Sequence, residues 1–427
     1  MLLHRHRRLG SVAFVLCLLA ASPLRAEEES LSRLEEEAAD AARAGDAERL
    51  EHLLDSLAKL DDPKAAEVLL ELGTDWPQAY RSVLFRLSGK LPTPLRARFF
   101  ELARRGTERQ RILAVDACAD RRDDESEAVV LAALKSKPPA LLRTAVYAAR
   151  KRRLATAVPA LIDLFERLDG GEPSVLLYDV EAALLQVTGR SFSTATEWRS
   201  FWEARKGDLV PPPSAEEGHR WPRTRVRARF FGSRVLSHRV VFVLDVSGSM
   251  RHGDPPRLER VKREFERLLG DFPGKAYFAV IAYSGVNGSL VRGSHLERPL
   301  PPFLGGKRWL VATGKKLQRA TRSRKAKVLE WVRQLRPEGK TFTSEAIRRA
   351  LAVPRADQIL LLSDGQPEEF DRVTGEPLPV DQVLEGILGR ARASRVRIDT
   401  IGMGSDGDEF LQRLAEGTGG SFVSVPE

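Results

Sequence analysis

Residues 240–250, VVFVLDVSGSM, decide the fold that this sequence predicts for its C-terminal half. The five consecutive large apolar residues at the start are typical of a strand buried on both faces inside a parallel sheet. The polar residues that follow therefore lie at the carboxyl end of the strand, where open α/β sheets place their ligand sites. Asp245, Ser247 and Ser249 alternate along a tight turn in which Gly248 gives the backbone its freedom. Small oxygen ligands spaced in this way suit a hard cation better than they suit a nucleophile.

The rest of the C-terminal half alternates strand and helix. Runs of apolar residues predict strands at 240–244, 277–283, 359–362, 397–401 and 422–425. Between them lie apolar stripes at helical spacing, of which the clearest is formed by Leu258, Val261, Phe265 and Leu268. Such alternation predicts a doubly wound, Rossmann-like α/β fold, in which helices wrap a parallel sheet through right-handed crossovers.

Two further polar pieces stand next to predicted elements of this region. Thr341, in the stretch GKTFTSEAIRRAL, lies in a loop just ahead of a helix that Thr343 is placed to cap. Asp364 and Gly365 end the buried strand of ILLLSDGQPEE. Any one of these pieces alone fits an ordinary polar turn. All three in order, each at a strand end or a helix start, favour one shared site.

With these motifs in place, residues from about 238 to 427 resemble a von Willebrand factor type A domain that carries a metal-ion-dependent adhesion site. The resemblance implies that five residues surround one divalent cation, namely Asp245, Ser247, Ser249, Thr341 and Asp364. The pair of glycines that usually precedes the threonine in the family is here Gly339-Lys340. This departure places a lysine near the rim of the ion, while all the ligand atoms are present.

The chemistry of this ligand set agrees with the resemblance. Hydroxyl oxygens carry no charge, so only the two carboxylates offset the charge of a dication, and compact ligands with retained waters fit Mg²⁺ or Mn²⁺ better than Ca²⁺. An ion with an open position recruits an oxygen from outside, and in the family that oxygen is typically an Asp or Glu of a protein partner. We therefore expect a non-enzymatic adhesion or scaffold protein.

Residues 27–206 are rich in Ala, Leu, Arg and Glu at helical spacing and contain nothing that resembles a strand. The segment repeats itself, because residues 111–122 realign on 142–153 at an offset of 31 residues, which places Arg121 on Arg152. Each copy reads as two short helices that bury their faces only by stacking on their neighbours.

The copies resemble HEAT-type α-solenoid repeats, and a weaker third copy lies at 176–187. A plain helical bundle is the alternative. Trp198 and Trp202 share a helix face near the end of the array, where we expect them to cap its core, with an aromatic binding stripe as the other interpretation. The resemblance implies a possible second surface for a protein partner.

Residues 1–26 have the parts of a secretory signal: a basic start, an apolar run at 9–21, and the small Ala26 ahead of an acidic stretch. The run is shorter than the ~20 residues of a spanning helix. We expect cleavage after Ala26 and export to the periplasm, the cell surface or the medium; an uncleaved membrane anchor is the alternative. Cleavage would remove Cys17 and leave Cys118 as the single cysteine, so no internal disulfide could stabilise the fold.

Residues 207–223 read as a proline-containing linker between the helical region and a C-terminal domain at 224–427. The formal net charge is +10, and two blocks are strongly basic, residues 220–239 and 307–327. We interpret both blocks as solvated faces, with polyanion binding as an alternative function. They lack the dense interleaving of aromatic and basic residues that single-stranded nucleic-acid platforms show, so we expect no nucleic-acid partner.

A metal-assisted hydrolase or phosphatase using the same cation is the other alternative function. It requires a base or acid beside the ion, and the sequence places none at a telling spacing. The position two residues after Asp245, where aspartate-nucleophile phosphatases carry a second aspartate, is Ser247. The predicted site therefore binds a partner and does not transform one.

Overall fold

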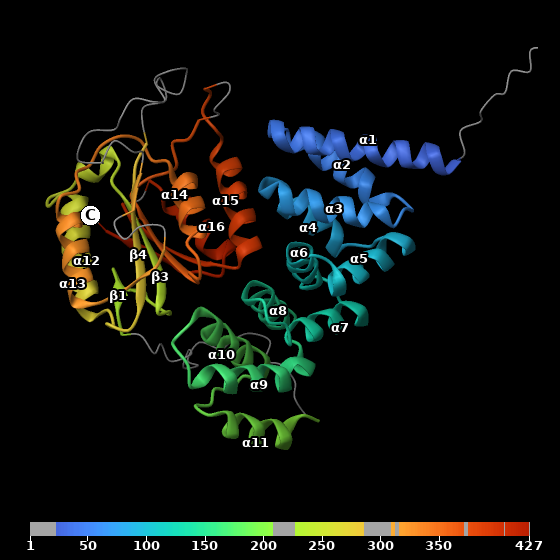
Figure 1. Ribbon diagram of the computed structural model, residues 1–427, viewed down its shortest axis with the longest axis horizontal. Coiled ribbons are helices and arrows are strands. Elements are labelled where there is room, and N and C mark those ends of the chain that lie inside the picture. Colours follow the sequence, from blue (N-terminus) through green and yellow to red (C-terminus); the bar gives the residue numbers. More distant parts are fainter. Residues whose placement is uncertain are drawn as a thin grey trace, which may run out of the picture.

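A computed structural model describes residues 23–207, 227–285, 309–311, 316–370, 375–404 and 406–426. The N-terminal part is helical and the C-terminal part is built around a sheet (Figure 1). The helices of the first part are α1 (Pro23–Ala44), α2 (Ala47–Lys59), α3 (Lys64–Asp75), η1 (Pro77–Ala79), α4 (Tyr80–Ser88), α5 (Thr93–Arg105), α6 (Glu108–Cys118), α7 (Asp124–Ala133), α8 (Pro139–Arg152), η2 (Ala155–Ala157), α9 (Val158–Asp169), α10 (Val175–Thr188) and α11 (Ala195–Arg205).

Most of the predicted leader and linker lie outside the described residues. The expected cleavage site after Ala26 falls in the first turns of α1, which begins at Pro23. Across the described part of the chain, no helix combines the length and apolar character that crossing a membrane requires.

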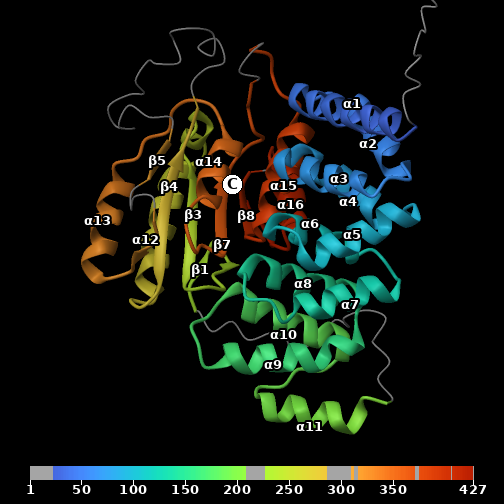
Figure 2. The same cartoon turned by 45° about the vertical axis from the view of Figure 1, so that its right-hand side comes forward.

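The N-terminal helices stack in two rows, in which most helices pack on the next in sequence and on the one after that (Figures 1 and 2). Contacts between neighbouring units recur at one spacing. Arg121 donates to the main-chain oxygen of Leu87 at 3.0 Å, and Arg152, 31 residues later, donates to that of Cys118 at 3.3 Å. The two arginines that the sequence repeat aligns therefore make the same contact, each to the end of the helix one unit earlier.

The end of the array is closed by aromatic packing. Trp198 is buried and meets Phe192 and Phe201 with ring centroids 4.8 and 6.4 Å away, while Trp202 is half-buried beside the same core. The tryptophans thus pack as a cap, as expected, and not as an exposed aromatic stripe.

Cys118 is buried as well, and burial raises the pKa of its thiol to about 12. This cysteine is a packing residue.

The C-terminal part is a mixed sheet covered by helices on both faces. Its main sheet has the order β5-β4-β3-β7-β8-β9, with β6 also paired to β4. The strands are β3 (Arg239–Asp245), β4 (Tyr277–Tyr283), β5 (Trp309–Val311), β6 (Gln318–Arg319), β7 (Gln358–Ser363), β8 (Arg397–Met403) and β9 (Phe422–Val425), and the helices are η3 (Gly248–Arg251), α12 (Arg257–Asp271), α13 (Arg322–Arg333), α14 (Thr343–Leu351), α15 (Val380–Ser394) and α16 (Asp408–Gly417). A small antiparallel hairpin, β1 (Arg229–Phe230) and β2 (Ser233–Arg234), precedes the sheet.

The expectation of a purely parallel sheet is wrong at one edge. β3, β4, β7, β8 and β9 run parallel, but β5 and β6 pair antiparallel with β4. Both are only two or three residues long, too short to produce an apolar run that a sequence pattern can detect.

Strand β3 sits in the middle of the sheet and sends alternate side chains to two cores. Val240, Phe242 and Leu244 enter the core under α12 and α13. Val241 and Val243 enter the core under α14, α15 and α16, on the face turned toward the N-terminal helices (Figure 2). The five apolar residues are fully buried, which explains why the strand shows no polar alternation.

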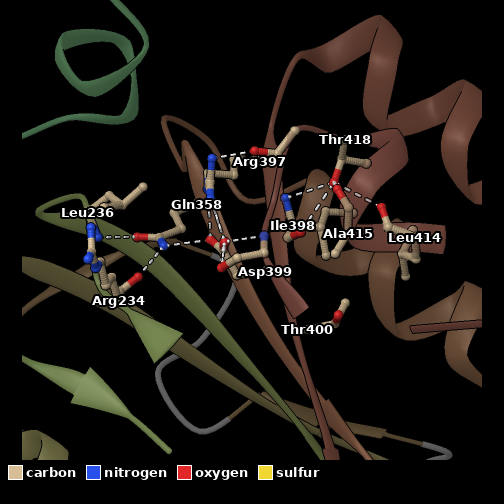
Figure 3. A network of polar contacts seen from close by, with 12 residues as sticks. Arg234, Leu236, Gln358, Arg397, Ile398, Asp399, Thr400, Leu414, Ala415 and Thr418 are labelled. Atoms are coloured by element: carbon tan, nitrogen blue, oxygen red, sulfur yellow. Dashed lines mark hydrogen bonds and ion pairs between the residues drawn. The ribbon is translucent and has the colours of Figure 1, made fainter. Parts of the chain in front are cut away.

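A polar network ties the starts of the strands together (Figure 3). Gln358, at the start of β7, accepts from the Leu236 amide at 2.8 Å and donates to Asp399 on β8 at 2.8 Å. Arg397 completes the network with an ion pair to Asp399 at 2.9 Å, and its guanidinium lies 5.3 Å from the ring of Tyr178 in α10. These buried groups connect the sheet to the segment before β3 and to the helical part.

Helix α15 docks onto the N-terminal helices η1, α4 and α6. Gly389 permits this close approach, because a β-carbon there would lie 1.9 Å from the main-chain oxygen of Pro77. Just past the helix, Arg395 forms a buried ion pair with Asp116 of α6 and hydrogen-bonds Thr144 at 3.0 Å. Tyr80 donates to the other oxygen of Asp116 at 2.9 Å. The face of the helical array formed by α4, α6 and α8 is therefore occupied by this chain's own second domain.

We predict that Arg395→Met lowers the free energy of unfolding by about 3–5 kcal/mol, because it leaves Asp116 buried without its ion-pair partner. A matched control is Arg81→Met, which removes another contact between the two parts, the ion pair with Glu385 at 2.7 Å, in which the Arg81 side chain is 66% exposed. That variant should lose no more than about 1 kcal/mol. Denaturant unfolding measures both, and equal losses would contradict the account.

Candidate metal centre

The candidate site is built on the carboxyl end of β3. Asp245 ends the strand opposite Tyr283, the last residue of β4, and its side chain is fully buried. One carboxylate oxygen accepts the Ser247 amide at 2.7 Å. The other accepts hydrogen bonds from the hydroxyls of Tyr283, at 3.2 Å, and Ser363. Asp245 is thus fixed in position by three donors from three segments.

Main-chain hydrogen bonds join the loops around this aspartate. Gly248 donates to the oxygen of Gly339 at 2.9 Å, which ties the loop after β3 to the loop before α14. Glu368 donates to the oxygen of Thr341 at 2.9 Å, which ties that second loop to the segment after β7. Gly339 has a φ of +82°, and a β-carbon there would lie 2.0 Å from the oxygen of Gly285. The glycine that the motif retains is therefore required by the packing of the backbone.

The structure brings polar side chains of the first and third motifs into direct contact. The Ser247 and Ser249 hydroxyls lie 3.1 Å apart, and Ser249 donates to Asp364 Oδ1 at 2.7 Å. Asp364 follows β7, which pairs with β3, so the two aspartates stand on neighbouring strand ends. Thr341, from the second motif, is buried in the loop that hydrogen-bonds to both other segments. The five predicted ligands thus come from three segments that are bound to one another.

Arg257 is part of this site, although it belongs to none of the three sequence motifs. It is the first residue of α12, and its guanidinium forms an ion pair with Asp364 Oδ2 at 2.9 Å. The Asp364 side chain is fully buried and that of Arg257 is 9% exposed. One fixed cation therefore already stands against one of the two carboxylates. In the sequence, only the position of Arg257 could have indicated this role. Arg257 lies twelve residues after Asp245 and directly follows two prolines, at the start of a helix.

Two buried carboxylates share this space. Burial, followed by the negative charge of Asp364, raises the pKa of Asp245 to about 7. Burial and the charge of Asp245 also raise the pKa of Tyr283, which keeps its phenol protonated as a hydrogen-bond donor. When both carboxylates are ionised, the site carries more negative charge than Arg257 alone balances.

The loop that carries Thr341 holds one further ion pair and one wrong prediction. The ammonium of Lys340 pairs with Glu368 at 2.6 Å. The prediction that Thr343 caps the following helix is wrong, because α14 begins at Thr343 itself and Phe342 occupies the cap position without a side-chain hydrogen bond. The Thr343 hydroxyl instead turns inward and lies 3.5 Å from that of Tyr283.

The donor set fits a small hard cation. Among the described residues no three His, Cys, Asp or Glu side chains gather in one place, so a metal here must draw on hydroxyl oxygens besides the two carboxylates. Serine and threonine hydroxyls with carboxylates are oxygen ligands of the kind that Mg²⁺ takes, together with retained waters. A dication between Asp245 and Asp364 would also remove the repulsion between these two buried charges.

The chain was compared with protein families and with known proteins. Residues 240–427 match the family model described as von Willebrand factor type A domain. Among solved structures, the chain is similar to "von Willebrand factor type A from Catenulispora acidiphila", with 22% identity and a TM-score of 0.33, over 46% of this chain and 40% of that one. The match thus spans less than half of that relative. No curated protein matches this chain. Residues 240–427 thus match the von Willebrand factor type A family by sequence, and the mixed sheet with helices on both faces is consistent with a domain of that family.

We predict that Arg257→Met destabilises the metal-free protein by about 3–5 kcal/mol, since Asp364 is left buried without a counter-charge. Mg²⁺ should then raise the Tm of this variant by more than it raises that of the wild type, because the ion replaces the lost charge. Thermal unfolding in chelator and in Mg²⁺ measures both effects.

A matched control is Arg267→Met on the same helix, whose ion pair with Glu264 is exposed on the arginine side. It should cost no more than about 1 kcal/mol and leave the response to Mg²⁺ unchanged. An Arg257→Met protein as stable in chelator as the wild type would show that the ion pair is not needed.

Proposed function

We propose that the von Willebrand factor type A domain holds one divalent cation, Mg²⁺ or Mn²⁺, and presents it to an acidic side chain of a protein partner. The ligands are Asp245, Ser247, Ser249, Thr341 and Asp364. The observation that carries the proposal is the convergence of the three motifs, in which Ser249 of the first donates to Asp364 of the third at 2.7 Å. Domains of this class commonly mediate protein–protein interactions, which agrees with a binding role.

The chemistry of the site favours capture of an outside carboxylate. Hydroxyl ligands contribute no charge, so the two aspartates are the only anions among the ligands, and Arg257 already neutralises part of Asp364. A dication held in this way keeps residual positive charge and an affinity for an anionic oxygen. Lys340 precedes Thr341 in the chain, and we propose that its ion pair with Glu368 borders the path by which such a partner approaches. We expect this pair to influence which acidic segments bind.

We propose further that the protein is not an enzyme. Among the described residues, the side chains that hydrogen-bond the predicted ligands are hydroxyls, carboxylates and the guanidinium of Arg257, and no histidine side chain is one of them. The two aspartates among these groups are committed to the metal as its proposed ligands, and a guanidinium stays protonated and cannot act as a general base. Hydrolysis of phosphate or carboxylate esters that disappears in Asp364→Ala would overturn this part of the proposal.

The remaining parts of the proposal concern location and scaffold. The protein is exported, on the pattern of residues 1–26, to the periplasm, the cell surface or the medium. The N-terminal helices form HEAT-type repeats, which is supported by one contact that occurs twice at an offset of 31 residues. Because α4, α6 and α8 face the protein's own second domain, a second partner would bind the outer row of helices.

Calorimetric titration with Mg²⁺ tests the metal site. The wild type should bind one ion, and Asp245→Ala should bind none, because the substitution removes a ligand that three donors hold in place. Asp271→Ala, which removes an exposed carboxylate at the end of α12, is the control and should bind as the wild type does. Equal binding by the wild type and Asp245→Ala, or no binding by either, would contradict the proposal.

A second experiment tests the partner. Immobilised wild-type protein in Mg²⁺ should retain a protein that chelator releases and that the Asp245→Ala protein does not retain. Substitution of one Asp or Glu in that partner should abolish the retention. A partner held equally well in chelator would bind somewhere other than the metal.

A further inference from the structure

A basic cleft lies at the opposite end of the sheet from the metal centre. It has a volume of about 580 Å³ and opens between the end of α9, the turn after it, and the starts of β3 and β4. Strand β3 runs from this cleft, at Arg239, to the metal centre, at Asp245, so the two sites are separated by about 20 Å at the usual rise of a strand. The cleft is therefore a separate place on the molecule.

The cleft joins the two basic blocks that the sequence places far apart. Arg239 belongs to the block at 220–239 and Lys316 to the block at 307–327, and both line the cleft. Arg167 from the helical part and Arg355 from the turn before β7 add two further cations. Neither block alone predicts a binding site, because the site exists only when the fold brings these segments together.

The charged residues that line the cleft are mostly cations. Glu172 is its only acid, and it pairs with Arg239 at 3.1 Å. Within the described part of the chain, Arg167, Lys316 and Arg355 form no ion pair, and all three side chains are exposed to solvent. Three cations thus face the cleft without a bound counter-charge.

Two further features mark the cleft as a built site. Tyr277 lines it and is 36% exposed as a residue, one of the few large hydrophobic residues left exposed in the described part of the chain. Arg355 holds a left-handed backbone with a φ of +66°, which a non-glycine residue adopts at a cost and which is concentrated at functional sites. The volume lies within the range of pockets that bind small ligands, and such pockets favour the junction between domains.

We propose that this cleft binds a small polyanion of the oligophosphate class. Guanidinium groups match the geometry of phosphate oxygens through paired hydrogen bonds, and a lysine adds a point charge. An oligophosphate places three or more negative charges within a few ångströms, which matches the three cations that lack a counter-charge. The Tyr277 hydroxyl supplies a donor for a remaining phosphate oxygen.

Calorimetric titration with sodium tripolyphosphate tests the proposal. The experiment uses the full chain in chelator, at about 0.15 M salt, so that neither the metal centre nor weak surface attraction contributes. The wild type should bind one molecule. Arg355→Gln and Lys316→Gln should each weaken binding about tenfold or more, as expected for the loss of a charge-assisted contact.

The matched control is Arg319→Gln, which removes an exposed cation of β6 from the same basic block but outside the cleft lining. It should bind as the wild type does, and so should Asp245→Ala, which separates this site from the metal centre. Unchanged Tm values show that the variants are folded. The proposal is overturned if the wild type does not bind at about 1 mM, or if Arg319→Gln loses as much affinity as Arg355→Gln.

Vesicles with a phosphate-bearing headgroup form the last arm, since a lipid presents the same chemistry. Free tripolyphosphate that competes with vesicle binding supports the proposal. Binding to vesicles without binding of the free oligophosphate contradicts the proposal. An acidic peptide serves as a further probe, and a protein that binds this peptide but not tripolyphosphate also contradicts the proposal.

Discussion

The pairing of β3 with a parallel neighbour on each side is the constraint on which the rest of the domain depends. Backbone hydrogen bonds to β4 and β7 fix the register of this strand. The register in turn fixes the position at which the apolar residues of β3 end and the polar residues begin. Asp245 therefore falls at a strand end beside Tyr283, and Asp364 falls one strand away. Two carboxylates are brought together by main-chain pairing, without any attraction between their side chains.

That proximity has an energetic cost, which the protein offsets locally. Hydroxyl groups and one backbone amide donate to Asp245, and Arg257 forms an ion pair with Asp364. An ion pair of this kind is weak evidence for stability, but removing one partner from a buried pair is costly. The same logic holds at the junction between domains, where Arg395 and Asp116 pair in a buried setting. In both places a single guanidinium makes a buried carboxylate tolerable.

Much of the domain was predictable, because its core strands and helices repeat strong apolar patterns. The strand at 240–244 and the stripe that begins at Leu258 correspond to β3 and α12. The antiparallel edge was missed because β5 and β6 are too short to carry a pattern. The five predicted ligands follow from motifs at strand ends, and the structure places them on three adjoining segments.

Long-range partners could not be predicted in the same way. Arg257 meets Asp364 across 107 residues and Arg395 meets Asp116 across 279, and nothing in the local sequence of either arginine indicates its partner. The basic cleft is a similar case, since its cations come from four segments. Periodicity reports which face of an element is buried, whereas the identity of the element that covers it depends on the whole fold.

The central claim is that the end of β3 holds a divalent cation. Anomalous diffraction from crystals soaked in Mn²⁺ tests it most directly, because the ion is located by its own scattering. The account predicts one peak between Ser247, Ser249 and Asp364, with hydroxyl oxygens at about 2 Å from the ion. Crystals that show no peak there, or a peak only at another place on the protein, would contradict it.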